Sequence, residues 1–333
     1  MPYADADGVG LYYEEAGRGT PIVFVHEFSG SLESWEGQMR QFSRRYHCIA
    51  FNARGYPPSD VPKTVSKYSY RAATDDIVVV MRHLGLSKAH IVGCSMGAYS
   101  TLQFGLHHPR LACSLTVVGA GAGSNLAKRA EFLRNTEAQA QRFLALGMPA
   151  SVTGYRTNPS RLPLLKKDAR GFAEFYRRVE QHSALGSANT QRGIQAKRPP
   201  IYVLEAALRR LQVPTHVVCG DEDDGGLEPA LFIKRVCPAA WLSIVAGTGH
   251  VVNLEEPARF NALLEDFLAQ VDSGRWRPRD PRSLNPSTMA KNTNATSGHK
   301  ARKNTSSCFA GLRGTATVKL TTRMIMARTR AGV

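Results

Sequence analysis

The sequence predicts an α/β protein with a mostly parallel, doubly wound sheet. Short apolar runs alternate with helical patterns from the start of the chain to about residue 272. The strand-like runs are almost continuously apolar, which is typical of parallel strands that helices cover on both faces. One of these runs leads directly into a G-x-S-x-G turn and then into a helical pattern. Together these three observations define the predicted fold class.

The expected elements follow one another in a regular order. An alternating run ends at Gly17, and later helical patterns end at Gly85 and Pro109, residue types that stop helices. In chain order, the expected strands are 11–15, 21–25, 47–51, 88–92, 112–118, 215–219 and 242–245. One expected helix passes through Trp35, Met39 and Phe42, and the others cover 70–84, 98–106 and 260–271.

The segment between residues 118 and 215 breaks this alternation. It contains helical patterns at 128–146 and 169–182, separated by proline-containing breaks. We interpret it as an inserted, mainly helical cap over the carboxyl edge of the sheet, where ligands bind in open α/β sheets. The predicted organisation is a core at 1–121, the cap at 122–210, more core at 211–273 and a basic tail at 274–333.

The net charge of +16 belongs mainly to that tail. Residues 274–333 hold 13 of the 43 basic residues and one acid, so residues 1–273 carry a net charge of only +4. The tail is rich in Ser, Thr, Asn, Lys and Gly, a composition that buries too little apolar surface to fold. Three interpretations stay open: a disordered extension, a segment that binds acidic partners, or an end that is not native to the domain. We expect no specific nucleic-acid partner.

The sequence also bears on the protein's compartment. The first seven residues lack the basic start and apolar core of a secretory signal, and no run of 18 apolar residues exists. The six cysteines are scattered without a C-x-x-C pair or a zinc-ligand spacing, which suits reduced thiols. We therefore expect a cytoplasmic protein with no membrane partner, no metal ion and no organic cofactor.

The G-x-S-x-G turn makes Ser95 the candidate nucleophile. A serine hydroxyl needs an exposed position and a nearby base, and a sharp strand-to-helix turn supplies the exposure. Gly93 and Gly97 lack a Cβ atom, so the strand and the helix can approach closely around the turn. The head of the following helix directs free backbone N–H groups toward developing negative charge.

The candidate base and its orienting acid come from loops near the end of the chain. His250 lies in a glycine-rich loop between the last expected strand and helix, and His26 at the end of an earlier strand is its competitor. We expect His107, His108 and His182 to be solvated. Of four successive acids at 221–224, we choose Asp223, ahead of Asp224 and Asp221, and expect most of the four to face water.

Together these residues resemble the α/β-hydrolase superfamily over roughly residues 5–272. The order Ser95, acid, His250 fits that fold. Further matching pieces are Val23-Phe24-Val25-His26, Arg54-Gly55 and Leu254-Glu255-Glu256-Pro257. Overall the chain resembles small capped bacterial esterases, enol-lactonases, cofactor-free haloperoxidases and C–C bond hydrolases.

The resemblance implies an oxyanion hole and exposes a departure from the family pattern. By alignment, the backbone N–H groups of Phe28 and Met96 form the hole, and His26 shapes the loop. Family members usually have glycine where this chain has Glu27. We expect the Glu27 side chain to point away; the alternative is that it contacts substrate or an arginine. Asn52 and the 56–58 segment also depart from the family pattern, in a loop that supports the site rather than taking part in the chemistry.

These features predict a serine hydrolase that acts through an acyl-enzyme on a small carboxylic ester or lactone. A serine nucleophile argues against the branches that use a carboxylate nucleophile. The alternatives on the same triad are C–C bond cleavage, acyl transfer or perhydrolysis. A ligand-binding sensor on this scaffold is a second class, and a nucleic-acid-associated protein recruited by the tail is a third.

Overall fold

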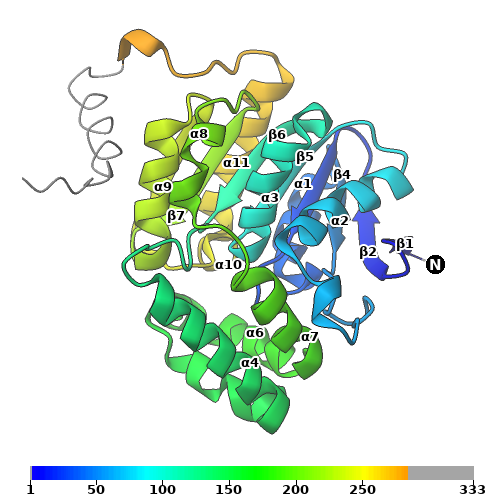
Figure 1. The fold of residues 1–333 in the computed structure, drawn as a ribbon. Coiled ribbons are helices and arrows are strands. Elements are labelled where there is room, and N and C mark those ends of the chain that lie inside the picture. The colour runs from blue at the N-terminus through cyan, green and yellow to red at the C-terminus, as the bar shows by residue number, and fades with distance from the viewer. Residues whose placement is uncertain (1, 284–333) are drawn as a thin grey trace, which may run out of the picture. The chain divides into compact units, whose positions relative to one another are not determined.

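The computed structural model describes residues 2–283 and shows an eight-stranded sheet with helices on both faces (Figure 1). The disorder predicted for the tail concerns residues that lie almost entirely outside this range. The strand order is β1-β2-β4-β3-β5-β6-β7-β8. The strands are β1 (Tyr3–Asp5), β2 (Gly10–Ala16), β3 (Pro21–Val25), β4 (His47–Phe51), β5 (Ala89–Cys94), β6 (Ala112–Val118), β7 (Thr215–Gly220) and β8 (Ala240–Val245).

The sheet is parallel from β4 through β8, and β1 and β2 add an antiparallel edge. The predicted mostly parallel sheet is confirmed. Alternate side chains of one strand enter different cores, since Val23 belongs to one buried cluster and Ile22 and Phe24 to another. Both sheet faces are therefore covered, which explains why the strands read as continuous apolar runs.

The helices divide between those two faces and the cap. Ile77 of α2 and Leu102 of α3 join the cluster of Val23, whereas Met39 of α1 and Leu264 of α11 join the other cluster. The α-helices are α1 (Glu36–Phe42), α2 (Tyr70–His83), α3 (Met96–His107), α4 (Arg129–Ser151), α5 (Leu162–Lys167), α6 (Ala169–Glu180), α7 (Ala184–Thr190), α8 (Glu205–Leu208), α9 (Asp224–Val236), α10 (Val252–Glu255) and α11 (Pro257–Asp272).

Short turns of other helix types connect these elements. Seven are 3₁₀ turns in the described residues, and η6 is a π-helix. They are η1 (Leu32–Trp35), η2 (Val65–Lys67), η3 (Pro109–Leu111), η4 (Val152–Thr157), η5 (Pro159–Arg161), η6 (Gln191–Gln195), η7 (Ile201–Leu204) and η8 (Pro281–Ser283). The short η5 carries cap residues to the cavity that contains Ser95.

The chain between β6 and β7 is mainly helical, and α4, α6 and α7 gather at one end of the sheet (Figure 1). Helix α4 breaks at Gly147, whose φ of 72° lies in the left-handed region. The last part of the segment returns to the core, since Tyr202 of η7 packs edge-on against Phe232 of α9 at 4.9 Å. The domain boundaries at 121 and 210 stay predictions.

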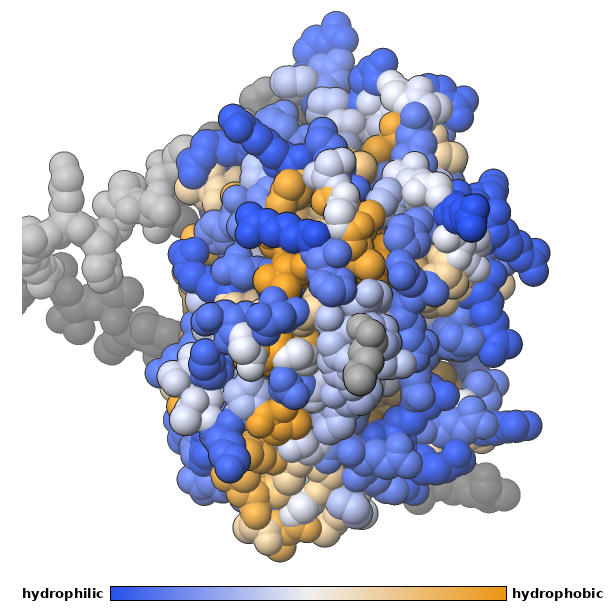
Figure 2. All heavy atoms as spheres, turned by 90° about the vertical axis from the view of Figure 1, so that its right-hand side faces the viewer, coloured by the Kyte–Doolittle hydropathy of each residue, from blue (hydrophilic) through white to orange (hydrophobic). Residues whose placement is uncertain are grey.

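The surface is mostly hydrophilic on the face shown in Figure 2, with apolar residues gathered in one group above its middle and in another toward its lower end. That end is the height at which the cap lies in Figure 1, and exposed large apolar side chains of the cap include Leu133, Leu144 and Leu146. Among residues 2–283, no helix combines the length and the apolar character that crossing a membrane requires.

Candidate active site

Ser95 stands at a sharp turn between β5 and α3. Its φ of 52° and ψ of −106° are strained for a residue with a side chain. The Ser95 N–H donates to the Val118 carbonyl of β6 at 2.8 Å, which fixes the turn against the neighbouring strand. A Cβ atom at Gly93 would lie 2.3 Å from the Gly97 carbonyl oxygen, so this position requires glycine.

Gly97 brings the end of β3 against the start of α3. A Cβ atom there would lie 2.1 Å from the Val25 carbonyl oxygen and 2.7 Å from that of His26. This close approach places the loop after β3 beside the Ser95 turn. Among residues 2–283, no acceptor forms a hydrogen bond with the Phe28 or Met96 backbone N–H. Phe28 is partly exposed, whereas Met96 is buried.

His250 and Asp223 form a hydrogen-bonded pair. His250 Nδ1 donates to Asp223 Oδ2 at 2.7 Å, and the Asp223 side chain is only 4% exposed. This bond leaves Nε2 of His250 as the nitrogen able to accept a proton. Glycine allows the packing, since a Cβ atom at Gly226 would lie 2.4 Å from Asp223 Oδ2. Asp221, Glu222 and Asp224 are exposed, as expected for most of the acidic run.

A second carboxylate, which sequence reasoning missed, holds the His250 loop. Buried Glu255 accepts the Gly249 N–H at 2.7 Å and the Val251 N–H at 3.1 Å. Burial raises the pKa of Glu255, and the two N–H bonds oppose that shift. The loop is also bound to the cap, because the His250 N–H donates to the Ser160 carbonyl at 3.0 Å. Glu255 belongs to a motif that carries the family resemblance, but its spacing shows no sign of this role.

His26 organises the loop after β3. It is fully buried, its Nε2 accepts the Ala53 N–H at 3.0 Å, and its Nδ1 therefore donates to the Glu27 carbonyl at 2.7 Å. Burial lowers the pKa of His26, which keeps the ring neutral in this arrangement. The Tyr56 hydroxyl donates to the Phe28 carbonyl at 2.9 Å and holds the same loop from its other side.

The Glu27 side chain packs inside its own loop. It is 1% exposed, its Oε1 accepts from the Ser34 hydroxyl at 3.2 Å, and its carboxylate lies against Gly30. Glu27 does not line the cavity that contains Ser95. The expectation that only its backbone replaces glycine is incomplete, because the side chain is a buried part of the loop.

A cavity of about 380 Å³ brings Ser95, Asp223, His250 and Phe28 together. No hydrogen bond joins the Ser95 hydroxyl to His250 within the described range; such bonds are often long before substrate binds. The cavity is lined by residues that follow β3, β5, β6, β7 and β8 and by the cap segment at 158–161. Its lining residues are Phe28, Ser29, Ser95, Ala122, Asn158, Pro159, Ser160, Arg161, Glu222, Asp223, Asp224, Gly225 and His250.

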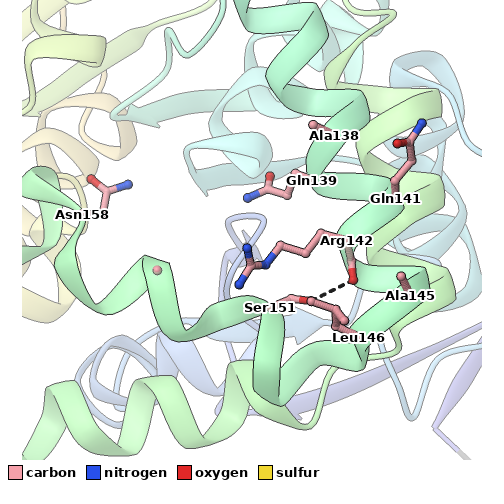
Figure 3. Close-up of a pocket in the computed structure, with 9 residues that line it drawn as sticks. Ala138, Gln139, Gln141, Arg142, Ala145, Leu146, Ser151 and Asn158 are labelled. Carbon is pink, nitrogen blue, oxygen red and sulfur yellow. Dashed lines mark hydrogen bonds between the residues drawn. The ribbon is translucent and has the colours of Figure 1, made fainter.

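A larger, open pocket of about 750 Å³ lies on the surface of the cap and shares Asn158 with the first (Figure 3). Gln139 and Arg142 of α4 line it, and none of the candidate catalytic residues does.

The prediction that His182 is solvated is wrong: its Nε2 is buried, and its ring packs edge-on against Tyr56 at 5.2 Å. Burial lowers the pKa of His182 to about 3.

Known proteins match this chain over most of its length. Residues 20–257 match the family model described as alpha/beta hydrolase fold. A Bacillus subtilis protein named "Putative 2-succinyl-6-hydroxy-2,4-cyclohexadiene-1-carboxylate synthase" is 24% identical over 257 residues, which cover 75% of this chain and 90% of that protein. The Azorhizobium caulinodans "Putative carbamate hydrolase RutD" is 27% identical, with coverage of 82% and 100%.

Solved structures agree with these matches. The structure titled "Est816 as an N-Acyl homoserine lactone degrading enzyme" is 26% identical, with a TM-score of 0.67, and the match covers 80% of this chain and all of that one. The chain belongs to the α/β-hydrolase fold family. Its relatives and structural neighbours identify it as an enzyme of the hydrolase type.

Proposed function

We propose that the protein is a serine hydrolase that cleaves a small carboxylic ester or lactone through an acyl-enzyme. The observation that carries this proposal is the His250–Asp223 hydrogen bond at 2.7 Å in the cavity that Ser95 also lines. A partly buried imidazole that a carboxylate orients, lining the same cavity as a strained serine, is the arrangement that acyl transfer needs. The name of the lactone-degrading neighbour supports the substrate class.

The proposed reaction has two halves. His250 Nε2 takes the proton of the Ser95 hydroxyl while Oγ bonds to the substrate carbonyl carbon. The tetrahedral intermediate then collapses, the bond to the alcohol oxygen breaks, and His250 returns the proton to that oxygen. A water molecule attacks the acyl-enzyme in the same way and releases the acid and Ser95. Asp223 holds the ring and stabilises its charged form throughout.

The oxyanion in this proposal is held by the backbone N–H groups of Phe28 and Met96. Met96 is the first residue of α3, so its N–H has no partner within the helix and points along the positive end of the helix dipole. Each such donor typically contributes about 3 kcal/mol to transition-state stabilisation. The bonds that hold His26 and Tyr56 keep the Phe28 donor in place before substrate arrives.

The test is turnover of p-nitrophenyl acetate and butyrate, combined with labelling by a fluorophosphonate and intact mass measurement. We expect turnover and a single adduct in the native protein, and loss of both in Ser95→Ala. Ser29→Ala is the matched control, because Ser29 lines the same cavity, and its adduct should persist. A folded protein with neither turnover nor adduct would refute the hydrolase mechanism and favour a ligand-binding role.

A further inference from the structure

Arg161 is a cap residue held close to the candidate catalytic groups. It ends η5, and the preceding residue, Ser160, accepts the His250 N–H at 3.0 Å. A Cβ atom on Gly249 would lie 2.3 Å from the Ser160 carbonyl oxygen, so η5 and the His250 loop are in close contact. Arg161 lines the cavity shared by Ser95 and His250. Its position is therefore fixed relative to the reacting groups.

The Arg161 guanidinium forms no hydrogen bond or ion pair with a carboxylate among the described residues, although its charge acts to lower the pKa of the nearby Glu255. Arg161 is 6% exposed, and among residues 2–283 its Nη1 is buried without a hydrogen-bond partner. No ion pair between described residues includes it, and its Cζ lies 5.0 Å from the centre of the Phe175 ring. Three other cap cations form ion pairs, which are Arg156–Glu180, Lys167–Glu256 and Arg192–Glu137. The buried Arg198 also lacks an ion pair among the described residues, but its Nη2 donates to the Ala122 carbonyl at 2.8 Å.

The acidic groups around the cavity are already engaged or face water. Asp223 accepts from His250, and Glu255 accepts two backbone N–H groups. Glu222 and Asp224 line the cavity but are exposed. An arginine does not lose its proton in a protein, so burial without an anion is costly. A cation kept there at that cost indicates a ligand that supplies the missing anion.

We propose that Arg161 binds a carboxylate of the substrate, so that the enzyme prefers a small ester or lactone whose acyl part carries a second, ionised carboxyl group. This inference rests on the proposed hydrolase function and specifies its substrate class. A planar guanidinium can donate two parallel hydrogen bonds to a carboxylate, which fixes orientation as well as affinity. The cavity of about 380 Å³ has the size of a site for a small molecule.

The test compares matched neutral and anionic esters. Monomethyl succinate and monomethyl glutarate are measured beside methyl butyrate and methyl pentanoate, with acid release followed in a pH-stat. We expect kcat/KM to favour the anionic esters by about tenfold to a hundredfold, the range for a hydrogen bond to a charged group. In Arg161→Met this preference should fall to about one, with the loss mainly in KM, and Arg161→Lys should retain part of it.

Arg170→Met is the control, because Arg170 is an exposed cap arginine paired with Glu174, and it should keep the full preference. An equal kcat/KM for both ester types in the native protein, or an unchanged preference in Arg161→Met, would overturn the proposal.

A binding measurement separates this proposal from the hydrolase proposal. Glutarate binding to Ser95→Ala is measured by calorimetry, with and without Arg161→Met, and a melting curve verifies that each variant is folded. Binding that disappears with Arg161 supports the anion site even if no ester is turned over. Turnover of neutral esters without glutarate binding would leave the hydrolase mechanism intact and reject the anion site.

Discussion

Arg54, in the loop after β4, and Arg161, in the cap, are equally buried, at 6% exposed, but their guanidinium groups differ in their hydrogen-bond partners. Arg54 Nε and Nη2 both donate to the Asp76 carboxylate, at 2.8 and 2.5 Å, and Nη1 donates to the Lys67 carbonyl at 2.6 Å. Arg161 has an aromatic ring beside it and an unbonded Nη1. The scaffold satisfies its buried cation completely, whereas the candidate site leaves one unsatisfied.

His216 is a third buried basic residue, and its ring is neutral at neutral pH. Its Nε2 bonds to the Ser243 hydroxyl at 2.8 Å, it has no carboxylate partner among the described ion pairs, and burial lowers its pKa to about 4. A histidine can become neutral, but an arginine cannot. A buried cation can pair with a carboxylate, as Arg54 does, lose its proton, as His216 does, or bond to a backbone carbonyl, as Arg198 does. Arg161 does none of these among the described residues, and it lines the cavity that contains Ser95.

The largest expected effect separates the site from the scaffold. Asp223→Asn should lower kcat by about four orders of magnitude, because an amide no longer favours the productive His250 tautomer or its charged form. Ester turnover and a melting curve measured together check this. The melting temperature should change little. A loss of less than tenfold would mean that Asp223 does not orient the base.

Removing the partner of Asp76 should cost stability. Arg54→Met leaves a carboxylate that is 2% exposed without its cation, and the free energy of unfolding should fall by about 3–5 kcal/mol. Burial already raises the pKa of Asp76, and Arg54 opposes that shift. Urea unfolding of the single variants and of Arg54→Met/Asp76→Leu gives the coupling between the two residues. A double variant no more stable than Arg54→Met would contradict this account.

The neutral state of His216 predicts a pH dependence of stability. Its folded pKa of about 4 lies below the unfolded value of 6.5, so the unfolded state binds the proton first. The stability that neutral His216 contributes is therefore complete above pH 6.5 and is lost as the pH falls toward 4. The free energy of unfolding falls by up to about 1.4 kcal/mol per pH unit in this range. Urea unfolding between pH 7 and 4 should show a shallower dependence for His216→Gln. An unchanged slope would mean that His216 is protonated in the folded protein.

The smallest expected effect tests whether Arg161 differs from Arg54 in its contribution to stability. Arg161→Met should change the free energy of unfolding by no more than about 1 kcal/mol, since it removes a desolvated charge together with one ring contact. Chemical unfolding at neutral pH, beside Arg54→Met, provides the measurement. A loss as large as that of Arg54→Met would show that Arg161 is a scaffold residue and that the two arginines are alike.

Much of the fold was predictable because its signals are local. Continuous apolar strands and the stops at Gly85 and Pro109 defined most elements of the sheet and its helices. The strand at Tyr3–Asp5 and the helix at Asp224–Val236 were missed. The first is too short for an alternating pattern, and the acidic run at 221–224 drew attention to its chemistry rather than to the helix that begins there.

The candidate site was predictable where a residue lies in a sequence motif that indicates its chemical role. Ser95, Asp223 and His250 belong to such motifs, and the structure brings them to one cavity. Glu255 and Arg161 were missed because their significance lies in contacts rather than in spacing. Glu255 accepts backbone N–H groups, which no sequence pattern shows, and Arg161 matters because of a bond that it does not make.

The bond from the His250 N–H to the Ser160 carbonyl links two parts of the chain that are 90 residues apart. One of them carries the candidate base, and the other carries the cation proposed to select the substrate. A displacement of η5 that opened the cavity would therefore pull on the base as well. The position of the candidate base and the position of the cap segment that lines the cavity are therefore tied to each other through this backbone hydrogen bond.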